Sequence, residues 1–454
     1  MNFDIKNKDI AIIGCGETGF HLSILLKKLG AKPSVFDTSK KQELLEKREY
    51  LKGLGIDLNL GIYTFDHLKD YQMIVLSPGI DSTKTPFYEL GKENKSLIGD
   101  IEILYHLTEI PFLCITGTNG KTTTTRLIAS ILEKSGMTIV MGGNMPGASL
   151  ASQWDKIVKS DLIVCEISSF QLEGIIDFKP HIACYLNISP DHIDRYPDFD
   201  AYFKAKNRIY ENMTSADYLI INAENENLKS LKSDIKAKIY EFSITREVDR
   251  GTFCSNDMFI FRDENSRVKL FSTTSMPLPG KHNTENILAS ITASMILNVN
   301  KESIKNAITN FKLSDHTLEL VDTINGVKFI DDSKGTNVDS VIKALNSFEE
   351  PIILLLGGKD KGCDYKMLLP HLKKKVKKLI LFGEARETIG SSVKSFKNLF
   401  NVNNMVDATR LAFKLSIPGD LVLLSPACSS FDEFKNFAHR GDVFKETVRS
   451  MRSI

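Results

Sequence analysis

Short apolar segments that end in Gly, Ser or Asp recur along this chain, with helical segments between them, and this alternation limits the possible folds more than any other feature. The clearest of these segments are Asp9–Gly14, Pro33–Asp37, Met73–Gly79, Phe112–Gly117, Asp161–Ser168, Ile182–Ser189, Tyr218–Asn222, Ile352–Gly358, Leu379–Gly383 and Leu421–Ser425. They are too short for buried helices and are rich in Ile, Leu and Val, which is typical of parallel strands covered on both faces. The sequence therefore predicts an α/β fold of right-handed βαβ units, whose ligands bind beyond the carboxyl ends of the strands.

The strand segments fall into three groups, which predict three domains in a chain of 454 residues. The first domain is expected to cover residues 1–99 and to be Rossmann-like. The central domain is expected to cover residues 100–313 and to contain a parallel sheet. Within it, polar and apolar residues alternate from Arg250 to Met276, which predicts an antiparallel excursion. The third domain, residues 314–454, is again expected to be Rossmann-like.

The charge balance and the lack of long apolar segments exclude several classes of protein. The chain has 58 Lys and Arg against 57 Asp and Glu, and a formal net charge of +1 argues against a nucleic-acid-binding protein, which needs a strongly basic surface. No apolar segment approaches the roughly 20 residues of a membrane helix, and charged residues stand where a signal peptide would be apolar. The seven cysteines are dispersed, which indicates free thiols in a reducing compartment. We therefore expect a cytoplasmic protein without membrane insertion.

The sequence TGTNGKT, residues 116–122, follows directly after a predicted strand and precedes a predicted helix. Glycines let such a P-loop wrap an anion, toward which backbone N–H groups and the helix N-terminus then point. Lys121 supplies a charge for the β- and γ-phosphates of ATP, and the hydroxyl of Thr122 can hold Mg²⁺. Ile115 stands where the standard pattern has its first Gly, so the loop is a shortened variant. The candidate ATP-binding residues here are Gly117, Thr118, Asn119, Gly120, Lys121, Thr122 and Thr123.

The first domain contains another glycine-rich turn, GCGETG at residues 14–19, and Asp37 ends its next strand. This is the GxGxxG pattern of dinucleotide-binding proteins. The pattern requires only a diphosphate at a helix N-terminus and a carboxylate near the nucleoside, which a UDP group satisfies as well as NAD does. An NAD-dependent dehydrogenase therefore stays an alternative at this point, although it would leave the P-loop without a function.

Polar side chains also follow several other predicted strands. Glu166 ends one strand of the central domain, where a carboxylate opposite a P-loop usually binds Mg²⁺ or positions water. The next strand ends in residues 187–194, which supply the imidazole of His192 and two carboxylates, those of Asp191 and Asp194. In the third domain, polar turns follow three strand ends, and together they predict a binding face.

These motifs together resemble the Mur ligase family, ATP-dependent enzymes that build peptidoglycan precursors. The motifs that carry the resemblance occur in the family's order and span essentially the whole chain: TGTNGKTT, EISSFQL, NISPDHIDRY, KAKNRIY, PGKHNTEN, DDSKGTN, LLLGGKDKG and SPACSSFDEFKNF. The opening GCGETG with VFDTS, the SSFQL segment and the closing motif are most similar to the members that add D-glutamate. Folylpolyglutamate synthase, a relative of the family, resembles the central and last domains but lacks such a first domain.

The resemblance implies a reaction in two steps. ATP phosphorylates the terminal carboxylate of UDP-N-acetylmuramoyl-L-alanine (UDP-MurNAc-L-Ala), and the amine of D-glutamate then attacks the acyl phosphate. It also implies a monomer that uses Mg²⁺ at two sites and carries a carbamylated lysine.

The resemblance further implies roles for individual residues. Catalysis is expected to depend on Lys121, Glu166, His192 and Lys206. The expected metal ligands are Thr122, Glu166, His192 and Lys206, the last as the lysine that the family carbamylates. Beyond the P-loop, ATP is expected to contact Asn283, Asn286, Asp332 and Lys334. The UDP substrate is expected to contact Thr18, Asp37, Thr38, Asn144, Ser168 and His192. D-Glutamate is expected to contact Thr336, Lys361, Ser430, Phe431 and Phe437.

At two positions, the residues of this chain and the family resemblance lead to different expectations. The pattern alone predicts that Lys206 is an exposed surface lysine, whereas the resemblance places it near a metal. The family usually has His-Arg at the start of the third domain, but here Thr317 follows His316, and Thr317 cannot supply a guanidinium to phosphate. A non-catalytic P-loop regulatory protein is a further alternative, but it would leave the region from His192 to Lys206 without a function.

Overall fold

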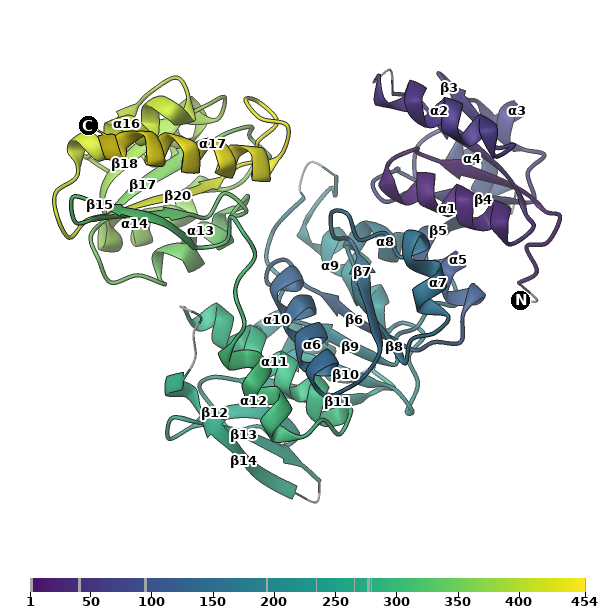
Figure 1. Cartoon of the computed structure of the whole chain (residues 1–454), viewed down its shortest axis with the longest axis horizontal. Helices are drawn as coiled ribbons and strands as arrows, with labels where there is room; N and C mark the ends of the chain where they lie inside the picture. The colour runs from purple at the N-terminus through teal and green to yellow at the C-terminus, as the bar shows by residue number, and fades with distance from the viewer. Residues whose placement is uncertain are drawn as a thin grey trace. The chain divides into compact units, whose positions relative to one another are not determined.

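Two compact units make up the chain in the computed structural model, which describes residues 3–39, 42–93, 96–192, 195–233, 235–264, 266–275, 278 and 280–453. The first unit consists of Met1–Ile188, Phe203–Ser272 and Ile287–Ala307, and the second of Ser189–Tyr202, Thr273–Asn286 and Ile308–Ile454. The first unit holds a five-stranded and a nine-stranded sheet, and the second holds a six-stranded sheet (Figure 1). The expected α/β fold with three separate, mainly parallel sheets is confirmed.

The five-stranded sheet is parallel throughout, in the order β3-β2-β1-β4-β5 (purple to blue in Figure 1). Its strands are β1 (Asp9–Ile13), β2 (Lys32–Asp37), β3 (Asp57–Leu60), β4 (Met73–Leu76) and β5 (Leu97–Gly99). The helices in this part of the chain are α1 (Glu17–Lys28), α2 (Glu43–Gly53), α3 (Phe65–Leu68), α4 (Phe87–Lys92) and α5 (Asp100–Leu107). The strand order reverses between β1 and β4, and ligands of such sheets bind at that switch point. The GxGxxG turn directly follows β1 and therefore lies there.

The nine-stranded sheet has the order β14-β13-β12-β11-β10-β9-β6-β8-β7 and is parallel except at β13 and β14. Its strands are β6 (Phe112–Thr116), β7 (Ile139–Gly143), β8 (Leu162–Glu166), β9 (Ile182–Tyr185), β10 (Tyr218–Asn222), β11 (Lys238–Ser243), β12 (Gly251–Ser255), β13 (Met258–Asp263) and β14 (Ser266–Ser272). The helices are α6 (Lys121–Lys134), α7 (Trp154–Ile157), α8 (Ser169–Glu173), α9 (Phe199–Asn207), α10 (Glu226–Lys229), α11 (Lys281–Ile296) and α12 (Lys301–Thr309). The antiparallel excursion expected from Arg250 onward is confirmed by β12, β13 and β14.

The six-stranded sheet has the order β15-β16-β20-β17-β18-β19 and is parallel except at β15. Its strands are β15 (Glu319–Ile324), β16 (Val327–Asp331), β17 (Ile352–Gly357), β18 (Val376–Phe382), β19 (Leu399–Asn401) and β20 (Leu421–Ala427). Its helices are α13 (Val338–Leu345), α14 (Leu369–Lys375), α15 (Arg386–Ser392), α16 (Met405–Leu415) and α17 (Phe437–Ser450).

Both faces of this sheet are buried under helices, as the continuous apolar strands predict. Along β17, Ile352 and Leu354 pack in one cluster with residues of α13, α14 and α15. Ile353 and Leu355 point to the opposite face and pack with residues of α16 and α17. The strand ends, rather than the strand faces, are therefore where this sheet exposes polar groups.

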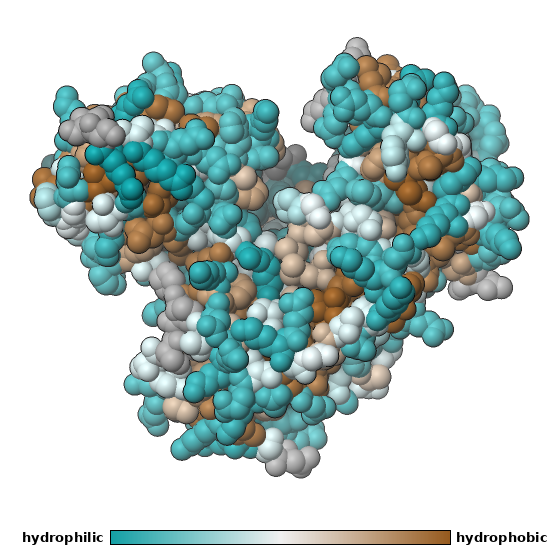
Figure 2. All heavy atoms as spheres, viewed as in Figure 1, coloured by the Kyte–Doolittle hydropathy of each residue, from teal (hydrophilic) through white to brown (hydrophobic). Residues whose placement is uncertain are grey.

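The surface and the cysteines agree with the composition. Figure 2 shows a face on which hydrophilic side chains predominate and hydrophobic ones gather in separate areas. In the part of the chain that the structure describes, no helix is both long and apolar enough to cross a membrane. None of the seven cysteines, all of which the structure describes, forms a disulfide, and Cys114, Cys165 and Cys184 are buried in the core around β6, β8 and β9.

Candidate active site

The P-loop connects β6 to α6 through two glycines in the left-handed region. Gly117 has φ +148° and Gly120, which caps α6, has φ +87°. A Cβ at Gly117 would lie 3.2 Å from the carbonyl oxygen of Asn187, so both the conformation and the close approach favour glycine. The loop leads directly into α6, whose first N–H groups have no partner within the helix. Such unpaired N–H groups at a helix N-terminus can bind phosphate.

Asn187, just after β9, fixes the first half of this loop. Its backbone oxygen accepts from the N–H of Thr118 at 3.1 Å, and its side chain exchanges two hydrogen bonds of 2.9 Å with the backbone of Asn119. Asn187 opens the NISPDHIDRY segment, but the sequence pattern alone indicates no role for it. Because Thr118 and Asn119 already donate their N–H groups to Asn187, the groups left for phosphate are those at the start of α6.

Glu166 ends β8 and forms a polar cluster with residues of two other elements. Its side chain is 3% exposed; Oε2 accepts from the hydroxyl of Thr122 at 2.7 Å, and Oε1 accepts from Nδ2 of Asn144 at 3.2 Å. Lys121 turns back on the loop, where its Nζ donates to the carbonyl oxygens of Gly117 and Thr118 at 2.9 and 3.0 Å. The structure thus brings together four of the residues singled out from the sequence: Lys121, Thr122, Asn144 and Glu166.

Lys206, in α9, is buried. Its residue is 2% exposed, and its Nζ lies 3.5 Å from Oγ1 of Thr116, the last residue of β6. Thr116 in turn donates to the backbone oxygen of Ile167 at 3.0 Å. The pattern-based expectation of an exposed lysine is therefore wrong, because α9 turns this side chain toward the end of β6 rather than toward solvent.

The candidate UDP site lies at the switch point of the five-stranded sheet. The carboxylate of Asp37 accepts from the N–H groups of Cys15 and Ser39, each at 2.7 Å, so it joins the end of β2 to the GxGxxG turn. A carboxylate oxygen has a further lone pair, so Asp37 can still accept from a ligand hydroxyl. Thr18 lies in the first turn of α1, and Thr38 is exposed just after β2. Ser168 instead caps α8, where its Oγ accepts from the N–H of Gln171 at 3.2 Å.

The three polar turns of the third sheet follow neighbouring parallel strands, β16, β20 and β17. The N–H of Ala427 donates to the oxygen of Gly335 at 2.9 Å, which joins the first two turns. Lys359 and Ser429 exchange backbone hydrogen bonds of 2.9 and 3.2 Å, which join the second and third. These contacts support the predicted binding face at one edge of the sheet.

The residues of this face differ in exposure. Asp332 is buried and accepts from Oγ of Ser425 at 2.7 Å, and burial raises the pKa of its carboxyl to about 7. Ser430 is buried, whereas Phe431 is 68% exposed. Lys334, Thr336, Lys361 and Phe437 are half-buried along the same turns and at the start of α17.

Other candidate residues belong to the second unit but lie outside the three turns of this face. Asn283 and Asn286 are buried in α11, with Nδ2 of Asn286 3.4 Å from Oδ1 of Asn283. His192 has φ +55° and follows Asp191, whose carboxylate accepts from Asn337 at 3.2 Å. Because Glu166 and Lys206 lie in the first unit, their predicted grouping with His192 stays a prediction, and Asp194 lies outside the described residues.

Thr317, at the position of the usual family arginine, makes a local contact. Its Oγ1 lies 3.1 Å from Oγ of Ser314, and its N–H donates to the Ser314 oxygen at 3.2 Å. These contacts close a turn, and no cation takes part in them.

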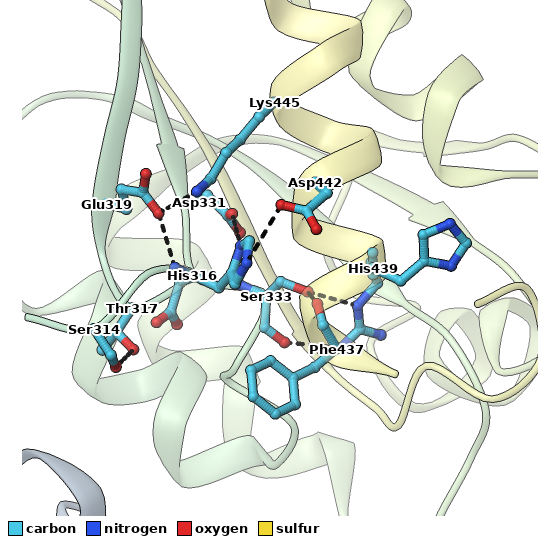
Figure 3. Close-up of polar contacts among 12 residues, drawn as sticks. Ser314, His316, Thr317, Glu319, Asp331, Ser333, Phe437, His439, Asp442 and Lys445 are labelled. Atoms are coloured by element: carbon cyan, nitrogen blue, oxygen red, sulfur yellow. Dashed lines mark hydrogen bonds and ion pairs between the residues drawn. The ribbon is translucent and has the colours of Figure 1, made fainter. Parts of the chain in front are cut away.

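A partly buried ionic group lies beside this turn, and no pattern in the sequence indicates it (Figure 3). Nδ1 of His316 lies 2.7 Å from Oδ2 of Asp331 and its Nε2 lies 3.6 Å from Oδ1 of Asp442, and the hydrogen bond to Asp331 raises the pKa of His316. Glu319 accepts from the His316 N–H at 2.8 Å and pairs with Lys445 at 2.6 Å. The side chains of His316, Glu319 and Asp331 lie close enough together to hold a cation. The carboxylate oxygens of Glu319 and Asp331 already accept from protein donors, so this group supports the fold.

The fold and these strand-end residues define a class of protein, and comparison with known families identifies it. The model described as "Mur ligase MurD-like, N-terminal domain" matches residues 8–99, "Mur ligase middle domain" matches residues 115–294, and "Mur ligase, glutamate ligase domain" matches residues 318–428. The chain belongs to the Mur ligase family.

Two relatives resemble the chain from end to end. A protein of Pelotomaculum thermopropionicum is 36% identical over 451 residues, which cover 99% of both chains. One of Koribacter versatilis is 38% identical over 450 residues, which cover 99% of this chain and 98% of the relative. Both relatives are named UDP-N-acetylmuramoylalanine–D-glutamate ligase.

Solved structures show the same fold at lower sequence identity. A pseudomurein peptide ligase type C of Methanothermus fervidus has a TM-score of 0.63 and 19% identity, covering 98% of this chain and 100% of its own. The UDP-N-acetylmuramate–alanine ligase MurC of Thermotoga maritima has a TM-score of 0.59 and 18% identity, with the same coverage. At these identities the two structures establish the fold alone.

Proposed function

We propose that this chain is an ATP-dependent ligase that joins D-glutamate to UDP-MurNAc-L-Ala and releases ADP and phosphate, a step in the synthesis of peptidoglycan precursors. The observation that carries the proposal is the end-to-end similarity to relatives named for this ligation, at 36% and 38% identity. The Mur ligase family is ATP-dependent and typically uses Mg²⁺. We further propose that the protein acts as a monomer in the cytoplasm.

The first step is transfer of the γ-phosphoryl group of ATP to the substrate carboxylate. A carboxylate is a poor electrophile, and the reaction must bring two anions together, so positive charge and fixed donors are the main requirement. The N–H groups at the start of α6 and the ammonium of Lys121 meet it. We expect Lys121 to exchange its present acceptors, the oxygens of Gly117 and Thr118, for phosphate oxygens.

The donor set around Glu166 fits Mg²⁺, which prefers oxygen ligands. The hydroxyl of Thr122 and the carboxylate of Glu166 lie within 2.7 Å of each other, and Asn144 orients the second carboxylate oxygen. When bound there, Mg²⁺ supplies charge that offsets the negative charge of the phosphates. His192 and Lys206 are further proposed metal ligands, and two metal sites are proposed, as the resemblance implies.

The burial of Lys206 supports its proposed carbamylation. Lys206 is 2% exposed, and burial in general favours the neutral form of an amine, which is the form that reacts with CO₂. The addition forms an N–C bond and releases one proton, so the side chain ends in a carboxylate-like group. That group would lie beside Thr116, at the end of the strand that leads into the P-loop.

The second step is attack of the D-glutamate amine on the acyl phosphate. The amine must attack in its neutral form, and exclusion of water protects the acyl phosphate from hydrolysis. We propose that Thr336, Lys361, Ser430, Phe431 and Phe437 hold D-glutamate. Lys361 supplies a charge for a carboxylate, and the turn after β20 supplies hydroxyl and backbone donors.

The test is release of ADP and phosphate by the purified chain with ATP and Mg²⁺. We expect release only when both UDP-MurNAc-L-Ala and D-glutamate are present, and not when L-glutamate, L-alanine, L-lysine or meso-diaminopimelate replaces D-glutamate. A dehydrogenase would instead change nicotinamide absorbance, and a non-catalytic P-loop protein would bind nucleotide without amino-acid-dependent release. No release with the correct pair at several pH values would show that the proposal is wrong.

A further inference from the structure

Arg440, in the first turn of α17, is fully buried and holds two separate turns of the third sheet. Its Nε donates to Oγ of Ser333 at 2.9 Å, and its Nη2 donates to the Ser333 backbone oxygen at 2.9 Å. Nη1 and Nη2 both donate to the oxygen of Cys428, at 3.2 and 3.1 Å, and Nη1 also donates to the oxygen of Ser429 at 3.3 Å. One guanidinium therefore makes five hydrogen bonds to residues that are about 100 positions apart in the sequence.

The acceptors of this guanidinium are all neutral oxygens. Among the described residues, no carboxylate lies within ion-pairing distance of Arg440. Burial lowers the pKa of Arg440 to about 10, so the side chain keeps its charge at neutral pH. A buried charge without a counter-ion normally destabilises a fold, and the five hydrogen bonds offset that cost. The carboxylates of Asp331, Asp432 and Glu433 lie beyond ion-pairing distance but still favour the charged form of Arg440.

The turns that Arg440 joins carry residues of the proposed binding face. Ser333 lies between Asp332 and Lys334, in the turn after β16. Ser429 precedes Ser430, in the turn after β20. Ser333 is also fixed from the helix side, since its Oγ donates to the backbone oxygen of Phe437 at 2.8 Å (Figure 3).

We propose that Arg440 is a positioning residue for the amino-acid pocket. By holding Ser333 to Cys428 and Ser429, it sets the spacing between the turns after β16 and β20. This inference rests on the proposed function. Lysine cannot replace Arg440, because a single ammonium lacks the planar fork that reaches both turns at once.

The test compares Arg440→Lys with Arg449→Lys, a matched control at an exposed position of the same helix. We expect Arg440→Lys to raise the KM for D-glutamate by about 10-fold or more, the effect of losing charge-assisted hydrogen bonds. The KM for ATP should rise less, through Asp332 and Lys334, and the KM for UDP-MurNAc-L-Ala should stay within about twofold. Arg449→Lys should change none of the three. Equal changes in all three values, or an unchanged KM for D-glutamate, would overturn the proposal.

A second variant and a second readout keep the test decisive if Arg440→Lys does not fold. Ser333→Ala removes the hydrogen bond to Nε and should raise the KM for D-glutamate in the same direction by about threefold. Hydrogen exchange of peptides covering residues 331–337 and 426–431 should become faster in both variants and stay unchanged in Arg449→Lys. This readout needs no substrate, so it separates the two proposals: a wild-type protein without D-glutamate-dependent activity refutes the proposed function, whereas unchanged exchange refutes the positioning role.

Discussion

Glu166, at a strand end of the nine-stranded sheet, and Arg440, beside two strand ends of the six-stranded sheet, are buried charged groups with different kinds of partner. Glu166 meets other side chains, because it accepts from both Thr122 and Asn144. Arg440 mainly holds the backbone, through the turns at Ser333 and Cys428.

This difference indicates a division of roles. Side chains that hydrogen-bond to one another can exchange those hydrogen bonds for contacts with a ligand without moving the backbone. This property suits catalytic and ligand-binding groups. Side chains that satisfy backbone oxygens fix the shape of a turn, and their loss leaves buried carbonyl groups without donors. Substitutions at the first set should therefore change turnover with little loss of stability, and substitutions at the second should change stability and affinity.

Glu166→Gln tests the first half of this comparison and should have the largest effect. The amide keeps the shape of the side chain but loses the charge that would hold Mg²⁺, so kcat should fall on the order of 10³-fold. The free energy of unfolding should change by less than about 1 kcal/mol, because an amide oxygen can still accept from Thr122. Glu133→Gln, on the exposed face of α6, is the control and should keep full activity. A Glu166→Gln protein that unfolds early would place Glu166 among the structural groups instead.

Lys206→Ala should have the next largest effect. If the carbamylated side chain supplies a carboxylate to the site, its removal should lower kcat by about 10²-fold, and added acetate or formate should restore part of the activity by entering the vacated space. Steady-state assays with and without the added carboxylate measure this.

The neighbouring Lys204 provides the control for that experiment. It lies two residues away on the same helix and is exposed, so Lys204→Ala should keep full activity and show no response to acetate. Equal activity of Lys206→Ala and wild type would rule out the carbamate.

The division between the two regions also explains what could be predicted from the sequence. The P-loop and Glu166 are predictable because a short local motif places them: the glycines, the strand before them and the helix after them are contiguous. The parallel strands are predictable for the same reason, since buried strands such as β17 are continuous apolar runs. Strands with polar residues, such as β3 at Asp57–Leu60, give no such signal and were missed.

The buried charges could not be predicted in this way. Lys206 and Arg440 lie on amphipathic helices, where a charged residue normally faces solvent, and only the packing of those helices on the strand ends buries them. His316 gives no local signal either, because its partner Asp442 comes from a helix more than 100 residues later. A short segment of sequence carries no information about contacts between residues that are this far apart in the chain.

Gly441→Ala tests the second half of the comparison. A Cβ at Gly441 would lie 2.6 Å from Oδ2 of Asp331 and would also overlap the ring of His316, so this buried pair must separate. We expect a net loss of about 1–2 kcal/mol in the free energy of unfolding, because the steric cost exceeds the gain in helix propensity. Gly390→Ala in α15 is the control: its Cβ would meet Leu381 at an ordinary 3.5 Å, and it should be neutral or stabilising. Denaturant unfolding measures both, and equal stability of the two variants would contradict the close approach.

The His316 group should give the smallest effect, and its sign depends on pH. The hydrogen bond to Asp331 raises the pKa of His316 in the folded protein, with Asp442 also favouring and Lys445 opposing the charged form. A raised pKa means that the protonated imidazole stabilises the fold fully below about pH 6.5, the value in an unfolded chain, and that this contribution disappears as the pH rises through the folded-state pKa. The difference in unfolding free energy between wild type and His316→Gln should therefore be about 1 kcal/mol larger at pH 5.5 than at pH 9.

His371→Gln is the control. It removes a half-buried histidine of α14, which has no carboxylate within ion-pairing distance among the described residues. Its difference in unfolding free energy from wild type should be the same at both pH values. A His316→Gln difference that grows with pH would mean that the buried group is held by a neutral imidazole, and the ionic description of this turn would then be wrong.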